Sequence, residues 1–282
     1  MSMVTSSKIL FLLLFSANLA FCQEVRLLYK VGEVADISVE VQTDLEIKVG
    51  DKDEMSARGI ETTEAQVKVV ADTPVVDRLP LTLAYKLKNY RTELEQGGEI
   101  TVFDIDTPTT DYLYAELKQL KGKEALIVLN DPRKGFEPKE THHPIAEILS
   151  AKKVSYLILS RLREVFSLAG QPLFQGKTID IPLVFGQEAV QEGFLSYKIT
   201  RITDDRIETD VTFTLPRQRK DVGAILVSSG NMTGKGVFNR KNALNFSLYL
   251  KGQFGSSVKA EDKSAQSQTI EVTLKIHGLV RD

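Results

Sequence analysis

Two histidine and two acidic side chains near the middle of the chain are of the types that bind metal ions. They are Glu140, His142, His143 and Glu147. His143 and Glu147 are four residues apart, a spacing that places side chains on one face of a helix. Pro144 follows His143, however, and a proline restricts the residue before it to extended conformations. We therefore interpret the cluster as the polar start of a helix and predict no metal site, cofactor or catalytic residue; a metal-dependent enzyme is our last-ranked alternative.

The segment Gly230-Asn-Met-Thr-Gly-Lys-Gly resembles a phosphate-binding loop at first sight. That motif requires four residues between its glycines and a serine or threonine after the lysine. Here three residues separate the glycines, and Gly236 follows the lysine. An alternating apolar segment follows in place of a helix, so no helix N-terminus would receive a phosphate group. We interpret the segment as a hairpin turn.

The first 22 residues have the pattern of a cleavable secretory signal. Lys8 precedes the apolar run 9–15, and Ala20-Phe21-Cys22 places small residues at the positions that a signal peptidase recognises. We predict cleavage between Cys22 and Gln23. The apolar run is too short for a transmembrane anchor, which needs about 20 residues, and polar residues follow it at once.

Export sets the expected compartment and domain organisation. We expect a signal peptide over 1–22 and one exported domain over 23–282, with a possible internal division near 170–190, located in a periplasm or secreted. In a second interpretation Cys22 carries a lipid anchor, although the bulky Phe21 before it disfavours this. Cys22 is the only cysteine in the chain, so a mature chain cleaved after it could form no disulfide.

The charge balance argues against a nucleic-acid-binding surface. The chain has 36 basic and 38 acidic side chains, a net charge of -2, whereas nucleic-acid binding requires a basic excess. Tryptophan is absent, which disfavours a platform for stacking sugars. Asn231 and Asn245 each begin an N-glycosylation acceptor triplet, which matters only in a eukaryotic source.

Alternation of apolar and polar residues is the clearest structural signal. From Asp36 to Val49 the odd positions are apolar except Thr43, and the even positions are polar. Because side chains alternate between the faces of a strand, this pattern predicts a long strand with one buried face. Similar alternation recurs in the segments 81–87, 207–215, 244–250 and 270–276. We expect a mainly β (α+β) fold, a curved antiparallel meander.

One segment has helical periodicity. Between Pro144 and Phe166 apolar residues recur every three or four positions, and Gly170 follows the segment. We predict a substantial helix near 144–166 that covers the apolar face of the sheet, with a break at Lys152-Lys153 as an open alternative.

The order of these segments resembles an uncharacterised family of exported, β-rich bacterial domains of unknown function. Its pattern is carried by the long alternating strand, the central helix, and three later runs: Phe194-Leu-Ser-Tyr-Lys-Ile-Thr-Arg-Ile, Thr233-Gly-Lys-Gly-Val-Phe-Asn-Arg-Lys-Asn-Ala-Leu and Ile270-Glu-Val-Thr-Leu-Lys-Ile. The resemblance implies a fold and a compartment, and no activity or site residues.

A sheet covered by one helix favours a binding module without enzymatic activity. We expect an apolar groove that takes a lipid, a lipoprotein or an extended peptide, so that the partner is a lipid or an envelope protein. Tyr156, Leu159 and Leu162 are candidates for lining this groove, although such a stripe more commonly fills a core. An interaction scaffold without a small ligand is the alternative.

Overall fold

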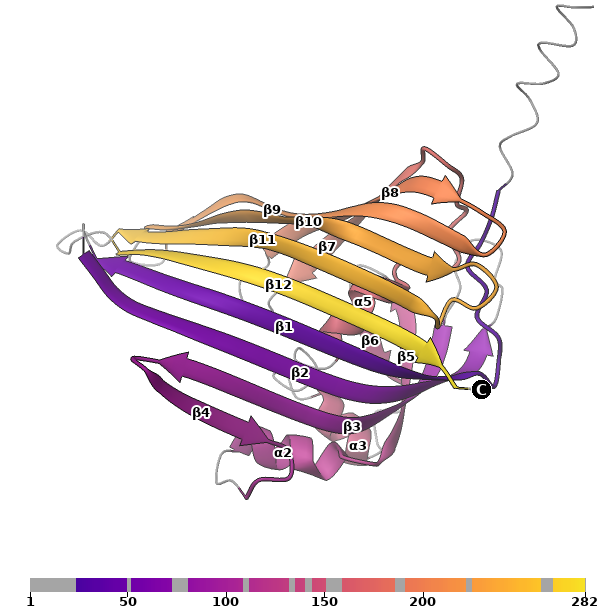
Figure 1. The fold of residues 1–282 in the computed structure, drawn as a ribbon, viewed down its shortest axis with the longest axis horizontal. Helices are drawn as coiled ribbons and strands as arrows, with labels where there is room; N and C mark the ends of the chain where they lie inside the picture. Colours follow the sequence, from indigo (N-terminus) through magenta and orange to yellow (C-terminus); the bar gives the residue numbers. More distant parts are fainter. Residues whose placement is uncertain are drawn as a thin grey trace, which may run out of the picture.

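The computed structural model describes residues 24–49, 52–72, 81–108, 112–131, 135–139, 144–150, 159–185, 191–221, 225–259 and 266–281. The predicted cleavage site, the first three residues of the Glu140–Glu147 cluster and Tyr156 lie outside these residues. Within them, one twelve-stranded antiparallel sheet dominates the protein (Figure 1). Its strands are β1 (Val34–Val49), β2 (Lys52–Asp72), β3 (Leu81–Gln96), β4 (Glu99–Asp104), β5 (Glu124–Asp131), β6 (Gly135–Pro138), β7 (Thr178–Phe185), β8 (Gln191–Ile202), β9 (Arg206–Asp221), β10 (Ile225–Asn239), β11 (Phe246–Lys259) and β12 (Gln266–Val280).

The sheet consists of two meanders that meet at the first and last strands. The strand order is β6-β5-β3-β2-β1-β12-β11-β10-β9-β8-β7, with β4 paired to β3 beside it. At the junction β1 and β12 pair over their whole length, with Val39 opposite Ile276 and Leu45 opposite Ile270. The prediction of a mainly β, curved antiparallel meander is confirmed.

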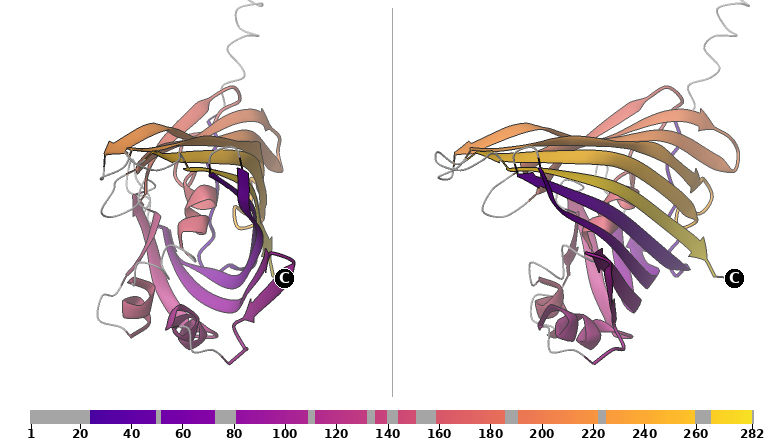
Figure 2. Two further views of the ribbon diagram at one scale, coloured as in Figure 1. Left: turned by 90° about the vertical axis from the view of Figure 1, so that its left-hand side faces the viewer. Right: turned by 60° about the vertical axis from the view of Figure 1, so that its left-hand side comes forward.

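The sheet curls strongly around its apolar face, so the strands form a trough (Figure 2). Glycines on the inner face allow this curvature. A Cβ atom at Gly252 would lie 2.7 Å from the carbonyl carbon of Asn231, and a Cβ atom at Gly234 would lie 2.7 Å from the carbonyl carbon of Tyr249. These distances are shorter than the roughly 3.5–4.0 Å at which carbon atoms make favourable contact. The backbones of β10 and β11 therefore approach each other in a way that only glycine permits at these positions.

These glycines correct the interpretation of the segment from Gly230 to Gly236. The segment is not a hairpin turn, because it lies inside β10 and pairs with β9 on one side and β11 on the other. Its glycines, Gly230, Gly234 and Gly236, share the even-numbered phase of the buried Met232 and face the inside of the trough. Their spacing serves the close approach of strands rather than a turn.

One end of the trough is filled by the N-terminal segment 24–33 and by α5 (Ser160–Phe166), which lies inside it (Figure 2). The Phe166 ring is fully buried and lies 5.8 Å from that of Tyr29, 5.4 Å from that of Phe136 and 6.0 Å from that of Phe246, measured between ring centroids. These aromatic contacts join the first described segment, the helix and both meanders in one core.

The helical segment predicted near 144–166 is described in two parts, α3 (Pro144–Ser150) and α5. Residues 151–158 between them lie outside the described residues. A further helix, α2 (Tyr112–Leu120), packs beside β3. None of the described helices has the length and hydropathy needed to cross a membrane.

Candidate binding face inside the curved sheet

The inner face of the sheet has a packed part and an open part. On β1 the inward side chains of Ile37, Val39 and Val41 are buried, whereas the next inward residues along the strand are only half-buried. The same change occurs at matching positions on the paired strands, after Leu274 on β12 and after Leu250 on β11. The core thus stops along one line that crosses the sheet.

Beyond this line the inner face keeps its apolar character but not its burial. We call this region the distal face. It includes half-buried side chains from β1, β12, β11 and β9 and small residues from β2 and β10, namely Thr43, Leu45, Ile47, Val49, Ala57, Gly59, Phe213, Leu215, Gly230, Gly252, Phe254, Ile270 and Val272. Phe213 and Phe254 lie with their ring centroids 5.7 Å apart. A half-buried apolar surface of this kind favours an apolar ligand, because covering it would remove apolar area from water.

A polar cluster lies where the core meets the distal face. Glu61 and Thr63 face inward from β2, and their register partners on β3 are Thr92 and Tyr90. We call these four residues the boundary cluster. The next pair outward on the same two strands is Gly59 and Leu94.

Burial controls the electrostatics of the boundary cluster. Burial raises the pKa of Glu61, while the positive charge of Arg161 and the side chain of Tyr90 act in the opposite direction and lower it. Burial also raises the pKa of Tyr90, and the neighbouring Glu61 carboxylate adds to this effect. The cluster therefore combines a half-buried carboxyl group, whose Oε1 is buried, with three neutral hydroxyl groups, and Arg161 is a cation near it.

Aromatic packing holds one side of this cluster in place. The Tyr90 ring is 2% exposed, and its centroid lies 6.3 Å from the ring centroids of both Phe103 and Tyr114. Phe103 on β4 and Tyr114 on α2 stack on each other. The rings of Phe103 and Tyr114, which lie outside the central strands of the sheet, thus hold the Tyr90 side chain in position.

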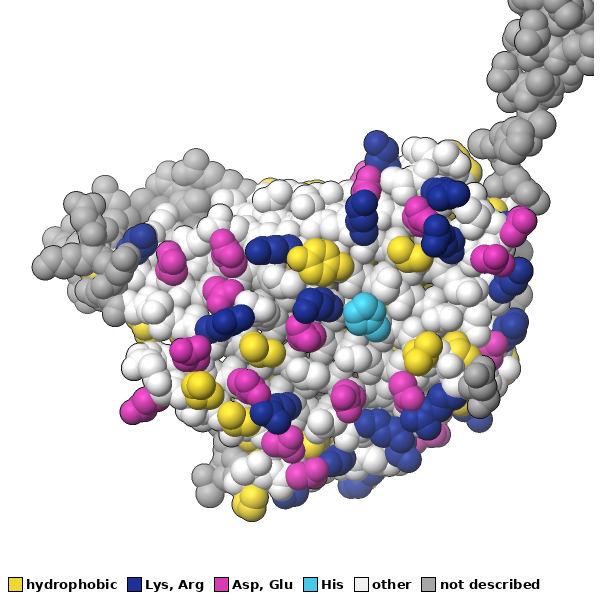
Figure 3. Space-filling view, in the orientation of Figure 1, with side chains coloured by type: hydrophobic (Ala, Val, Ile, Leu, Met, Phe, Trp, Pro, Cys, Tyr) yellow, Lys and Arg dark blue, Asp and Glu magenta, His cyan; other side chains and the backbone are white. Residues whose placement is uncertain are grey.

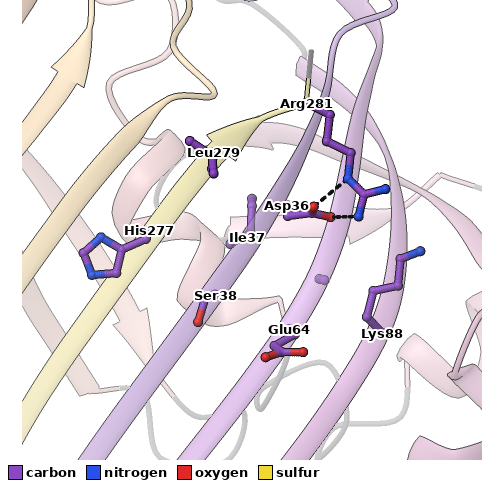
Figure 4. A pocket seen from close by; sticks show the side chains of 9 residues that line it. Asp36, Ile37, Ser38, Glu64, Lys88, His277, Leu279 and Arg281 are labelled. Carbon is purple, nitrogen blue, oxygen red and sulfur yellow. Dashed lines mark hydrogen bonds and ion pairs between the residues drawn. The ribbon is translucent and has the colours of Figure 1, made fainter.

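The outer face of the sheet has a different character, with acidic and basic side chains interspersed (Figure 3). A hollow of about 490 Å³ lies on this face, lined by residues of β1, β2, β3 and the end of β12. Figure 4 shows the side chains that line it. There Arg281 donates two hydrogen bonds to Asp36, with Nη2 2.7 Å from Oδ1. Leu279 is 67% exposed. In this open hollow Asp36 and Arg281 are paired with each other.

The structure places the predicted site residues as follows. Leu159 and Leu162 are 1% and 2% exposed and belong to the core around α5. Glu147 is exposed on α3, and the described residues contain no group of histidine, cysteine and acidic side chains that could hold a metal ion.

Sequence reasoning missed the boundary cluster, although one signal for it was present. Along β2 the inward residues are odd-numbered, and Glu61 is a charged residue among them. A charged residue in the inward, mostly apolar phase of a strand is a signal for a candidate site. The β3 partners were hidden by an irregularity in the pairing between Glu64 and Ala65, which shifts the inward phase of β3 from odd to even residues.

No model of a known protein family and no curated protein sequence matches the chain. Among solved structures, the fold is similar to that of lipovitellin in a structure described as "Lipid-protein interactions in lipovitellin", with a TM-score of 0.50 and 9% sequence identity. The match covers 90% of this chain, which spans 26% of the lipovitellin chain.

Two further solved structures match with TM-scores below 0.5. The Pseudomonas aeruginosa protein OccK7 (OpdD) gives a TM-score of 0.25 at 6% identity, covering 88% of this chain and all of that one. The InvG secretin β-barrel of Salmonella gives 0.19 at 9% identity, covering 99% and 69% of the two chains. Neither score supports a common fold.

Proposed function

We propose that the protein is an exported, non-enzymatic binding module that holds the acyl chain of a lipid against its distal face. The proposal rests on one observation: the apolar inner surface of the sheet is continuous, but only one part of it is covered. Its packed part is covered by α5 and the N-terminal segment, while its distal part is equally apolar but only half-buried. An apolar chain laid along the trough would continue the core outward.

The similarity to lipovitellin supports this choice of ligand over a peptide or a lipoprotein. The two proteins are similar in fold alone, and lipovitellin is a protein whose structure is described in terms of lipid–protein interactions. A curved antiparallel sheet is suited to this task because its inner side chains line one continuous concave surface.

Binding can be measured with the neutral fluorescent probe N-phenyl-1-naphthylamine on protein purified without detergent from the exported fraction. N-terminal sequencing of that protein should begin at Gln23. We expect saturable binding of the probe and its displacement by C12 amphiphiles. We also expect the ligand to raise the melting temperature, because it binds the folded state.

A matched pair of variants on β12 tests the location. Ile270→Gln places a polar group of similar size on the distal face and should weaken probe binding about tenfold, as expected for the loss of a buried aliphatic contact. Its neighbour Glu271 is exposed on the outer face, so Glu271→Gln should leave binding unchanged. Absence of saturable binding, or equal binding by both variants, would favour an interaction scaffold instead.

A further inference from the structure

The boundary cluster contains hydrogen-bonding atoms that the described residues leave unused. Glu61 Oε1 and Thr63 Oγ1 are buried and have no hydrogen-bond partner among these residues, and Thr92 Oγ1 is equally buried, with the Tyr90 hydroxyl as its neighbour. Thr63 is only 5% exposed. A buried polar atom without a partner costs about 1–3 kcal/mol, so such atoms are normally satisfied by a further group.

These atoms converge because of the strand register. Glu61 lies opposite Thr92, and Thr63 is the next inward residue on β2. Directly opposite residues, such as Glu61 and Thr92, have Cβ atoms about 4.5–5.5 Å apart, and diagonal neighbours, such as Thr63 and Thr92, about 7–8 Å apart. One small polar group between these side chains, at the inner edge of the distal face, could therefore reach all three. Two of the three are hydroxyl groups, which both donate and accept, and the third is a carboxyl oxygen.

Charge decides which polar group fits. Among the described residues, Arg161 is the cation that acts on Glu61, and its charge opposes the effect of burial on the carboxyl group. A carboxylate on the ligand would lie beside Glu61, and two neighbouring carboxylates disfavour each other in a buried site. An ammonium group on the ligand would be attracted by Glu61 but repelled by Arg161, so the pair would not offset the cost of removing its charge from water. An uncharged hydroxyl group avoids both penalties, because it can donate to Glu61 Oε1 and accept from a threonine hydroxyl.

Resting on the proposed function, we infer that the distal face selects amphiphiles with an uncharged hydroxyl headgroup, such as long-chain alcohols or monoacylglycerols, over fatty acids of the same chain length. The hydroxyl group lies at the boundary cluster, and the acyl chain extends along the distal face past Gly59 and Leu94.

The test compares four ligands with the same C12 chain as competitors for N-phenyl-1-naphthylamine at pH 7.5. The ligands are dodecanol, monododecanoylglycerol, dodecanoate and dodecylammonium. We expect the two uncharged ligands to bind at least tenfold more tightly than the two charged ones. Stronger displacement by monododecanoylglycerol than by dodecanol would assign the natural ligand class to glycerides, and the reverse order would assign it to simple alcohols.

Two variants locate the selectivity. Glu61→Gln removes the carboxylate, so dodecanoate should gain affinity and its disadvantage against dodecanol should fall below threefold. Thr63→Val keeps the shape of the side chain without its hydroxyl and should weaken dodecanol about tenfold while probe binding stays constant. Glu64→Gln on the outer face of the same strand is the control and should change none of these values. Thermal melts confirm that each variant is folded, and Glu61→Gln alone suffices if Thr63→Val does not fold.

Different results overturn different claims. Equal affinity of the wild type for dodecanol and dodecanoate, unchanged in Glu61→Gln, would refute the hydroxyl selectivity and leave acyl-chain binding intact. Failure of the probe and of all four ligands to bind would refute both the selectivity and the proposed function.

Discussion

Replacement of Gly252 by alanine tests whether the curvature of the sheet depends on its inner glycines. The added Cβ atom would lie 2.7 Å from the carbonyl carbon of Asn231 on β10. Since carbon atoms make favourable contact at about 3.5–4.0 Å, the overlap is about 1 Å. A methyl group has no rotamer by which to avoid it, and the obstacle is backbone. The strands β10 and β11 must therefore move apart.

The cost follows from the hydrogen bonds between these two strands. If about three ladder bonds near Gly252 are weakened, at about 1 kcal/mol each, the loss is about 3 kcal/mol. Replacing glycine in a strand regains about 0.5–1 kcal/mol of backbone entropy. We expect Gly252→Ala to lower the free energy of unfolding by about 2 kcal/mol.

Urea unfolding followed by circular dichroism measures this difference. Gly255 on the same strand is the control, because the nearest atom to a Cβ there is the carbonyl oxygen of Gln268 at 4.0 Å. Gly255→Ala should change the free energy of unfolding by less than about 0.5 kcal/mol or increase it slightly. Equal stability of Gly252→Ala and wild type would show that the close approach of β10 and β11 is not required for the fold.

Two further predictions concern β1 and the boundary cluster. Val39 is 4% exposed, so Val39→Asp should lower the free energy of unfolding in urea by about 3–5 kcal/mol, because it buries an unpaired charge. The control, Glu40→Lys on the outer face, breaks only an exposed pair with Lys275 and should lower it by less than about 1 kcal/mol. Burial raises the pKa of Glu61 in the folded state above its ordinary value of 4.5. The folded protein therefore binds this proton more tightly than the unfolded chain does. As a result, the free energy of unfolding falls as the pH rises from about 4.5 through the raised pKa. Glu61→Gln should therefore equal wild type in unfolding free energy below pH 4.5 and exceed it above, and a difference that is independent of pH would contradict this.

Much of the fold follows from the alternation of apolar and polar residues. The odd residues of β1 face the inside as predicted, and the inward phase of β9 and β12 is equally clear in the sequence. The period of a strand fixes which face each side chain occupies, so these assignments needed no knowledge of partners.

The pairing of distant strands and the boundary cluster could not be predicted in this way. No feature of the sequence near β1 identifies β12 as its partner, because the pairing of distant strands depends on the packing of the whole sheet. The β10 glycines break the apolar alternation and so suggested a turn, although they serve close strand contact. The cluster itself depends on the shift of phase in β3, which arises from its pairing with β2.

The junction of β1 with β12 has a consequence for the order in which the protein can fold. Glu40 and its partner Lys275 are 235 positions apart in the chain. During synthesis β1 can pair with β2 early, but its other edge stays open until the final strand has been made. Contacts between such distant positions slow folding, and an open edge can pair with other chains. A chain held unfolded until its C-terminus is complete, as a polypeptide is when it crosses a membrane in an extended state, would avoid that exposure.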